Sequence, residues 1–383
     1  MGIARNTRKK RKDVMRLSRM KKQLGFTIIE FTIAMAVTIV ALAATMLAFR
    51  DATQANQNVT QREDIADNMR AGLNLLEQDL IQTGTGIPTG GISIPSNVAS
   101  GSCTTGYANI TRPLLNGSTF FPHCNVTLPA IEPGNALGPL IVSPDATSNF
   151  NTDIISLMYL DNSLTLNTYP IYLPAGSGAP GVGGGCAGSI SPTGSFAIFD
   201  PSCVVSPSPS GATVNAGDLL MFSNANGNTL VEVTSVSWPK VYFGAGDAFG
   251  LNQTGLPNGT LINLQSAGTY PPTTVERIAL VTYYLDNVSV PGRVELIRRL
   301  NFNAGQTVGD TLENLQFTYN FNDGIAVNEV TVPTGYSESQ IRSTNVYIGG
   351  RSDNVSPQSH KYLRLNFQTQ VSLRGMAYYN AYP

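Results

Sequence analysis

The sequence is poor in the residues on which most enzyme chemistry depends. Its 383 residues include only two histidines, His123 and His360, so a histidine-based catalytic triad would need one of them. No Gly-x-Ser-x-Gly, His-Glu-x-x-His or Walker motif occurs in the chain. The acidic residues are scattered, which leaves a carboxylate pair open until a fold is known. We therefore expect that the protein is not an enzyme and carries no cofactor.

Cysteine is scarce as well. The chain has four cysteines, Cys103, Cys124, Cys186 and Cys203, and a zinc site would need tighter cysteine and histidine spacing. His123 beside Cys124 is the only hint of such a site, so we expect no metal. An even count favours disulfides in an oxidising compartment, and four cysteines allow three connectivities. Nearest-neighbour pairing would close two loops of about 20 residues, each contributing ~3 kcal/mol.

Charge is sparse and unevenly distributed. Charged residues make up only 13 % of the chain, whereas glycine (37) and proline (23) are plentiful, which favours short strands joined by turns and long loops. Residues 1–25 hold ten lysines or arginines and one acid, Asp13. From Phe26 onward, 14 basic and 24 acidic residues remain, a net charge of −10. Because the basic head lacks interleaved aromatic residues, we expect a topology signal and no nucleic-acid partner.

One long apolar run follows the basic head. Residues 26–49 read FTIIEFTIAMAVTIVALAATMLAF, and Glu30 is their only charged residue. As a helix this run is ~36 Å long, whereas a bilayer has a hydrocarbon core of ~30 Å. The basic head should stay in the cytoplasm by the positive-inside rule, which places the remainder of the chain on the outer side. The sequence therefore predicts a membrane helix with the lipid bilayer as a partner.

Three interpretations of this run compete. A secretory signal cleaved near Ala41-Leu42-Ala43 would have an apolar stretch of about 7–15 residues, and this one is longer. A plain signal anchor fits the length but leaves Glu30 unexplained. The third interpretation, set out next, accounts for both the length and Glu30.

Residues 21–30, KKQLGFTIIE, resemble the class III leader of type IV prepilins. The resemblance implies that a prepilin peptidase cuts between Gly25 and Phe26 and that the new amine of Phe26 is N-methylated. It also implies that Glu30, at the fifth mature position, neutralises the amine of an adjacent subunit during assembly. Protonation of Glu30, or its reach to the nearby interface, is the alternative. The leader 1–25 is long, and Met15 or Met20 are alternative starts to Met1.

The apolar run is predicted to continue into a longer helix. No proline occurs between Phe26 and Ile87, and residues 84–88, GTGIP, form a stop signal. Apolar residues at helical spacing form one stripe in the polar second half: Ile65, Met69, Leu73, Leu76 and Leu80. We therefore predict one helix over 26–84, with a membrane half at 26–49 and an amphipathic half that packs on the head.

The head is predicted to be built from strands in two regions. The first, 85–270, is rich in loops and carries the cysteines, with strands at 153–160, 195–199, 218–222, 229–236 and 240–243. The second, 271–383, has strands at 274–285, 293–300, 312–321, 344–350 and 362–374. Alternation of polar and apolar residues along 362–368 predicts a half-buried antiparallel strand. The fold class expected is therefore α+β, with a mostly antiparallel sheet.

Two further patterns point to a subgroup of the prepilin family. Residues 68–84 resemble the segment after the membrane helix in PilW-type minor pilins and in the J-type minor pseudopilin of type II secretion. The residues that carry it are Arg70, Leu73, Leu76, Asp79, Leu80 and Gly84. The order of later strands also resembles PilW-type minor pilins, through Tyr283-Tyr284, Arg298-Arg299, Glu313–Tyr319 and Ser372–Arg374. The resemblance implies a pilin-like fold.

The resemblance implies a minor pilin that joins a priming or tip complex of a type IV pilus, since a bulky head packs poorly many times over. Its partners would be the prepilin peptidase, other pilins and the assembly platform of the inner membrane. The head would lie in the periplasm before assembly and in the filament afterwards. A minor pseudopilin of a type II secretion system is the first alternative. A pilus-displayed adhesin or sugar-binding head is the second, and an anchored enzyme is the third.

Overall fold

A computed structural model of the chain describes residues 27–96, 127–145, 149–164, 166, 188–199, 213–357 and 359–376. The predicted cleavage site between Gly25 and Phe26 lies outside these residues. So do the disulfide candidates, Cys103, Cys124, Cys186 and Cys203.

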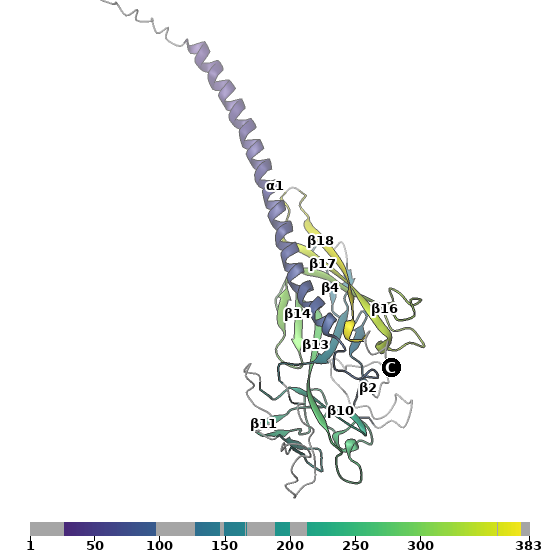
Figure 1. The fold of residues 1–383 in the computed structure, drawn as a ribbon. Coiled ribbons are helices and arrows are strands. Elements are labelled where there is room, and N and C mark those ends of the chain that lie inside the picture. Colours follow the sequence, from purple (N-terminus) through teal and green to yellow (C-terminus); the bar gives the residue numbers. More distant parts are fainter. Residues whose placement is uncertain are drawn as a thin grey trace, which may run out of the picture. The chain divides into compact units, whose positions relative to one another are not determined.

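A single long helix, α1 (Ile28–Gln82), dominates the N-terminal part of the described chain (Figure 1). Thr27 precedes it, and the Phe31 N–H donates to the Thr27 carbonyl over 3.1 Å, which is the first hydrogen bond of the helix. The helix ends just before Gly84, whose φ of +82° a residue with a side chain rarely adopts. The predicted helix over 26–84 is thus confirmed to within two residues at each end.

The chain divides into two compact units, Met1–Asn56 and Gln57–Pro383. In the described part of the first unit, every residue after Thr27 belongs to α1. The second unit contains the remainder of α1 and every described strand. All described strand pairs are antiparallel, which confirms an α+β protein with an antiparallel sheet region.

The strands, many of them short, form several sheets (Figure 1). Their bounds are β1 (Ile92–Ser93), β2 (Thr127–Leu128), β3 (Ile131–Gly134), β4 (Leu140–Val142), β5 (Asn149–Asn151), β6 (Ile154–Leu160), β7 (Ser189–Ile190), β8 (Phe196–Ile198), β9 (Leu219–Asn224), β10 (Gly227–Glu232), β11 (Ser235–Ser237), β12 (Lys240–Tyr242), β13 (Thr274–Asp286), β14 (Glu295–Leu300), β15 (Gln306–Gly309), β16 (Leu312–Phe321), β17 (Ile341–Val355) and β18 (Tyr362–Ser372). Two short 3₁₀ helices, η1 (Leu261–Leu264) and η2 (Glu338–Gln340), lie in the connections.

Strand β13 organises the largest sheet, which has seven strands. Its first residues pair with β9, its middle with β6 and its last residues with β14, so one strand joins segments from both predicted head regions. Ten consecutive residues of β13, from Arg277 to Asp286, are buried, because β13 lies inside the sheet and between packed layers. The two predicted regions, 85–270 and 271–383, therefore share one sheet.

A second sheet has the order β16-β17-β18. Along β18, Arg364, Asn366 and Gln368 are exposed, whereas Leu363, Leu365 and Phe367 are half-buried and pack against the core. This is the alternation that the sequence predicted for one half-buried strand.

The amphipathic half of α1 packs on these sheets through the predicted apolar stripe. Ile65, Met69, Leu76 and Leu80 are buried in the main hydrophobic core. Gly72 faces the same way, and a Cβ at this position would lie only 2.9 Å from a methyl group of Leu296 on β14. A glycine in mid-helix costs roughly 1 kcal/mol relative to alanine, and here it permits close approach of the helix to the sheet.

A smaller core lies among β7 to β12 and η1, with Phe199, Phe222 and Phe243 at its centre. One predicted strand in this part, 229–236, is wrong as a single element, since β10 and β11 occupy it. The Thr234 N–H donates to the Tyr242 carbonyl, so the chain leaves β9 at this point and joins β12. No glycine or proline separates the two segments, so sequence alone did not reveal the change of partner.

Candidate membrane and assembly surface

The first half of α1 exposes an unusual amount of apolar surface. Every residue from Thr27 to Thr53 is exposed. The exposed fractions include 85 % for Ile28, 63 % for Phe31 and 62 % for Val37. Burial of one such side chain stabilises by about 1.5–3 kcal/mol, so a surface of this kind is unfavourable in water. The helix is long and apolar enough to cross a membrane.

Glu30, the only charged residue among residues 27–49, caps the start of the helix. The Thr27 N–H and its Oγ1 hydroxyl each donate to Oε2 of Glu30 over 3.0 Å. In return, the Glu30 N–H donates to Oγ1 of Thr27 over 3.2 Å. This is a capping box, which satisfies backbone N–H groups that have no partner inside the helix.

The capping box involves Thr27, which was not predicted as a site residue. The run Thr27-Ile28-Ile29-Glu30 matches the Thr-x-x-Glu pattern of a capping box, so the signal was present in the sequence. The arrangement holds the Glu30 carboxylate against Thr27, the residue that follows Phe26 in the sequence. A carboxylate in this position can attract a cation, and the N-terminal end of a helix favours its negative charge.

In the second unit, Asp79 on α1 is the centre of a buried ionic cluster. Arg298 on β14 donates from Nε to Oδ2 over 2.7 Å and from Nη2 to Oδ1 over 3.1 Å. The Tyr159 hydroxyl on β6 donates to Oδ1 over 2.9 Å, and the Tyr283 hydroxyl on β13 donates to Oδ2 over 2.6 Å. The Asp79 side chain is only 4 % exposed. One carboxylate thus joins the helix to three strands of the largest sheet.

The surroundings of this cluster shift the pKa values of its tyrosines and of Arg298. Burial first, and then the charge of Asp79, raises the pKa of both Tyr283 and Tyr159, so both phenols stay protonated and donate hydrogen bonds. Burial by itself lowers the pKa of Arg298, but the hydrogen bonds and charge of Asp79 outweigh this and raise it overall. The guanidinium therefore stays charged beside the carboxylate.

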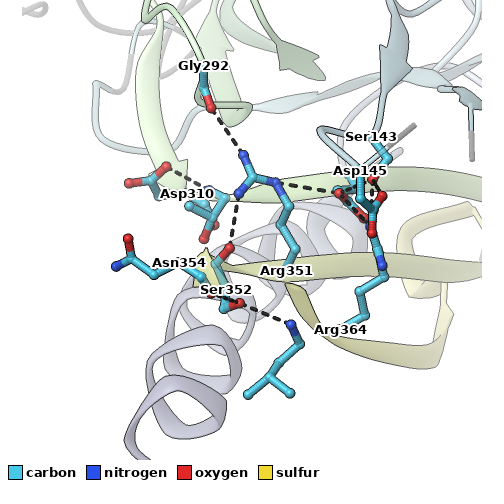
Figure 2. Close-up of polar contacts among 11 residues, drawn as sticks. Ser143, Asp145, Gly292, Asp310, Arg351, Ser352, Asn354 and Arg364 are labelled. Carbon is cyan, nitrogen blue, oxygen red and sulfur yellow. Dashed lines mark hydrogen bonds and ion pairs between the residues drawn. The ribbon is translucent and has the colours of Figure 1, made fainter. Parts of the chain in front are cut away.

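A second buried carboxylate is that of Glu313 on β16. It pairs with Arg351 and Arg364, and Arg364 also reaches Asp145 in the loop after β4; Figure 2 shows both arginines and Asp145. Arg364 donates from Nε to Oε2 of Glu313 over 2.8 Å and from Nη2 to Asp145 over 2.8 Å. The Nε of Arg351 lies 3.5 Å from Oε1 of Glu313, and its Nη2 donates to the Gly292 carbonyl over 3.1 Å. Hydrogen bonds to Glu313, followed by those to Asp145, raise the pKa of Arg364.

The residues that carried the family resemblance are partly brought together by the fold. Asp79, Tyr283 and Arg298 meet in one cluster, although 219 positions separate Asp79 from Arg298. Glu313 belongs to the other cluster. Arg70 lies on the surface, where it pairs with Asp67 over 3.6 Å. These groups are structural partners of one another, and among the described residues no set of three or more His, Cys, Asp or Glu side chains could hold a metal ion.

The fold and the exposed helix define an α+β protein with one N-terminal helix that is long and apolar enough to cross a membrane. Comparison of the chain with models of known protein families, with curated protein sequences and with solved structures finds no match.

Proposed function

We propose that this protein is a pilin-like subunit, a minor pilin that assembles through α1 into the priming or tip complex of a type IV pilus. The observation that carries the proposal is the continuity of α1. One uninterrupted helix has a fully exposed apolar half with a capped carboxylate at its start, and an amphipathic half that is built into a folded head.

The mechanism proposed follows from the helix surface. Before assembly, residues 26–49 lie in the inner membrane, where lipid covers the apolar side chains. A prepilin peptidase cuts between Gly25 and Phe26 and frees an amine next to Thr27. A charged carboxylate inside a bilayer costs at least about 2.5 kcal/mol, which favours any arrangement that gives Glu30 a cationic partner. The amine of a neighbouring subunit supplies that partner when the helices pack together in a filament.

The size of the second unit, Gln57–Pro383, supports a place at a tip over a place in the repeating filament. A minor pseudopilin of a type II secretion system would use the same helix in a different machine. Its own support is the resemblance of residues 68–84 to the J-type minor pseudopilin. A pilus-displayed adhesin or sugar-binding head is the remaining alternative.

The test of the class is the N-terminal mass of the mature protein, purified from membranes with and without the prepilin peptidase. We expect a chain that begins at methylated Phe26 and that disappears when the peptidase is absent. A chain that begins at Ala44, or one that is never cut, would contradict the proposal.

The test of the assembly role compares variants at Glu30. Glutamine can replace glutamate in a capping box, so Glu30→Gln removes the charge and keeps the cap, whereas Glu30→Ala removes both. We expect normal cleavage in both variants and incorporation into filaments reduced about tenfold or more in both, since a charge-assisted contact contributes about 1.5–3 kcal/mol. Glu63→Ala, an exposed glutamate later on the same helix, is the matched control. Unchanged incorporation of Glu30→Gln would remove the role given to the charge.

A further inference from the structure

A cavity of about 180 Å³ lies where α1 ends, within the second unit. Its wall comes from four separate segments of the described chain. Gly84, Ile87 and Thr89 follow the helix, Ala130 precedes β3, and Glu338 begins η2. Met376, after β18, completes one side. The wall is therefore made of structure that the core holds in place, since Ile87, Ala130 and Met376 also belong to the main hydrophobic cluster.

The charge of this wall comes from one residue. Among the described residues, Glu338 is the only one with an ionisable side chain that lines the cavity, and the residue is 92 % buried, with 8 % of its surface exposed. Within the part of the chain that the structure describes, no side chain or backbone group donates a hydrogen bond to its carboxylate, and no cation pairs with it. The neighbouring polar residues of the wall, Ser337 and Ser339, hydrogen-bond to each other through their hydroxyls.

The carboxylate of Glu338 places a negative charge beside an apolar wall. A charge in such a setting attracts cations more strongly than one on an open surface, because less water screens it. The C-terminal end of α1 adds to the effect, because the last turn of a helix carries a partial negative charge of roughly half an electron. Gly84, two residues beyond the end of α1, forms part of the cavity wall, so both sources of negative potential act on the same space.

The size and lining of the cavity define the rest of the ligand. A cavity of ~150 Å³ accommodates benzene, so one of about 180 Å³ has room for roughly seven heavy atoms. Ile87, Pro88, Ala130 and Met376 provide an apolar lining for a short alkyl stem. Thr89 is exposed at the cavity, which marks the side from which a ligand enters.

We propose that this cavity binds an alkylammonium or alkylguanidinium group, with the cation against Glu338 and the alkyl stem against the apolar wall. The lysine or arginine side chain of a partner protein and a free small amine both present this chemistry. The site lies in the second unit and uses only the C-terminal end of α1, not its exposed apolar half, so it stands independently of the filament proposed above.

The experiment uses the full chain in detergent micelles. Butylguanidinium and butylammonium are titrated by calorimetry, with n-butanol as the neutral control of the same length. We expect saturable binding of both cations and none of the alcohol in the same concentration range. Glu338→Gln should weaken cation binding about tenfold or more, since a hydrogen bond to a charged group contributes about 1.5–3 kcal/mol. Glu63→Gln, an exposed glutamate on α1, should leave it unchanged.

A second variant separates the cavity from its charge. Thr89→Trp places a large side chain at an exposed position of the rim and should block binding without loss of the folded state. The absence of saturable cation binding to the parent protein would overturn the proposal. Equal binding by the parent and by a folded Glu338→Gln variant would overturn it too.

A photo-crosslinker placed at position 89 in cells distinguishes the two sources of the ligand. Attachment to a peptide that contains a lysine or arginine at the attached site identifies a partner side chain. A crosslink that free butylguanidinium abolishes, and that maps to a small amine, identifies a free ligand.

Discussion

Replacement of Asp79 by asparagine is the most informative single change in the second unit. The side chain keeps its shape and loses its charge, while Arg298 stays in place with only 16 % of its side chain exposed. Two Arg298 donors and two tyrosine hydroxyls then face a neutral amide whose nitrogen cannot accept a hydrogen bond. The change therefore leaves a buried cation without its counter-ion.

The expected loss is about 3–5 kcal/mol in the free energy of unfolding, which is the usual effect of removing one partner of a buried ion pair. Such a loss is a large part of the total stability of a domain, about 5–15 kcal/mol. Removing the cation as well, in the double variant with Arg298→Met, should recover at least ~1 kcal/mol, because the uncompensated charge is then absent.

The measurement is urea unfolding of the full chain in micelles, followed by near-ultraviolet circular dichroism of the buried tyrosines. Asp67→Asn is the matched control, because Asp67 lies on the same helix with its side chain 78 % exposed. We expect it to change the free energy of unfolding by less than about 0.5 kcal/mol. A loss of under ~1 kcal/mol for Asp79→Asn, or a double variant less stable than the single one, would refute this account of the cluster.

Two further predictions concern the head. Burial, and then the nearby charge of Asp247, raises the pKa of Glu232 from 4.5 to about 7, although the Phe249 N–H opposes the rise. Between pH 4.5 and 7, the folded state therefore binds a proton that the unfolded state has released. The contribution of protonated Glu232 to stability is complete below pH 4.5 and is lost as the pH rises through 7. Glu232→Gln should be as stable as the parent near pH 4.5 and more stable by roughly 3 kcal/mol at pH 8, at ~1.4 kcal/mol per tenfold change in proton affinity. The same difference in unfolding free energy between variant and parent at both pH values would contradict this prediction. Gly84→Ala should destabilise by at least about 1 kcal/mol, because the φ of +82° is strained for alanine and its Cβ would lie 2.6 Å from Met376. A thermal midpoint equal to that of the parent would show that the turn relaxes freely.

Helices and strands whose structure depends on a single segment could be predicted from local sequence patterns. The absence of proline between Phe26 and Ile87, and the stripe at Ile65, Met69, Leu76 and Leu80, predicted the helix and its buried face. The strand over 312–321 was predicted at its observed bounds, because its residues alternate between core and surface. Periodicity acts over a few residues, so it can be read along the chain.

Partners distant in the sequence were decided only by the tertiary structure. Nothing local marks Asp79 as the partner of Arg298, or Glu313 as the partner of Arg364, because packing determines which buried charges meet. The short strands of the loop-rich region were missed for a related reason, since β1 and β2 have two residues each and exist only as a pair. The helix, its apolar and amphipathic halves and the strand-rich head follow from local composition and spacing, so they could be predicted from the sequence. The buried ion clusters and the cavity at Glu338 were decided by the fold, since each needs groups that only chain folding brings within hydrogen-bond distance or into one wall.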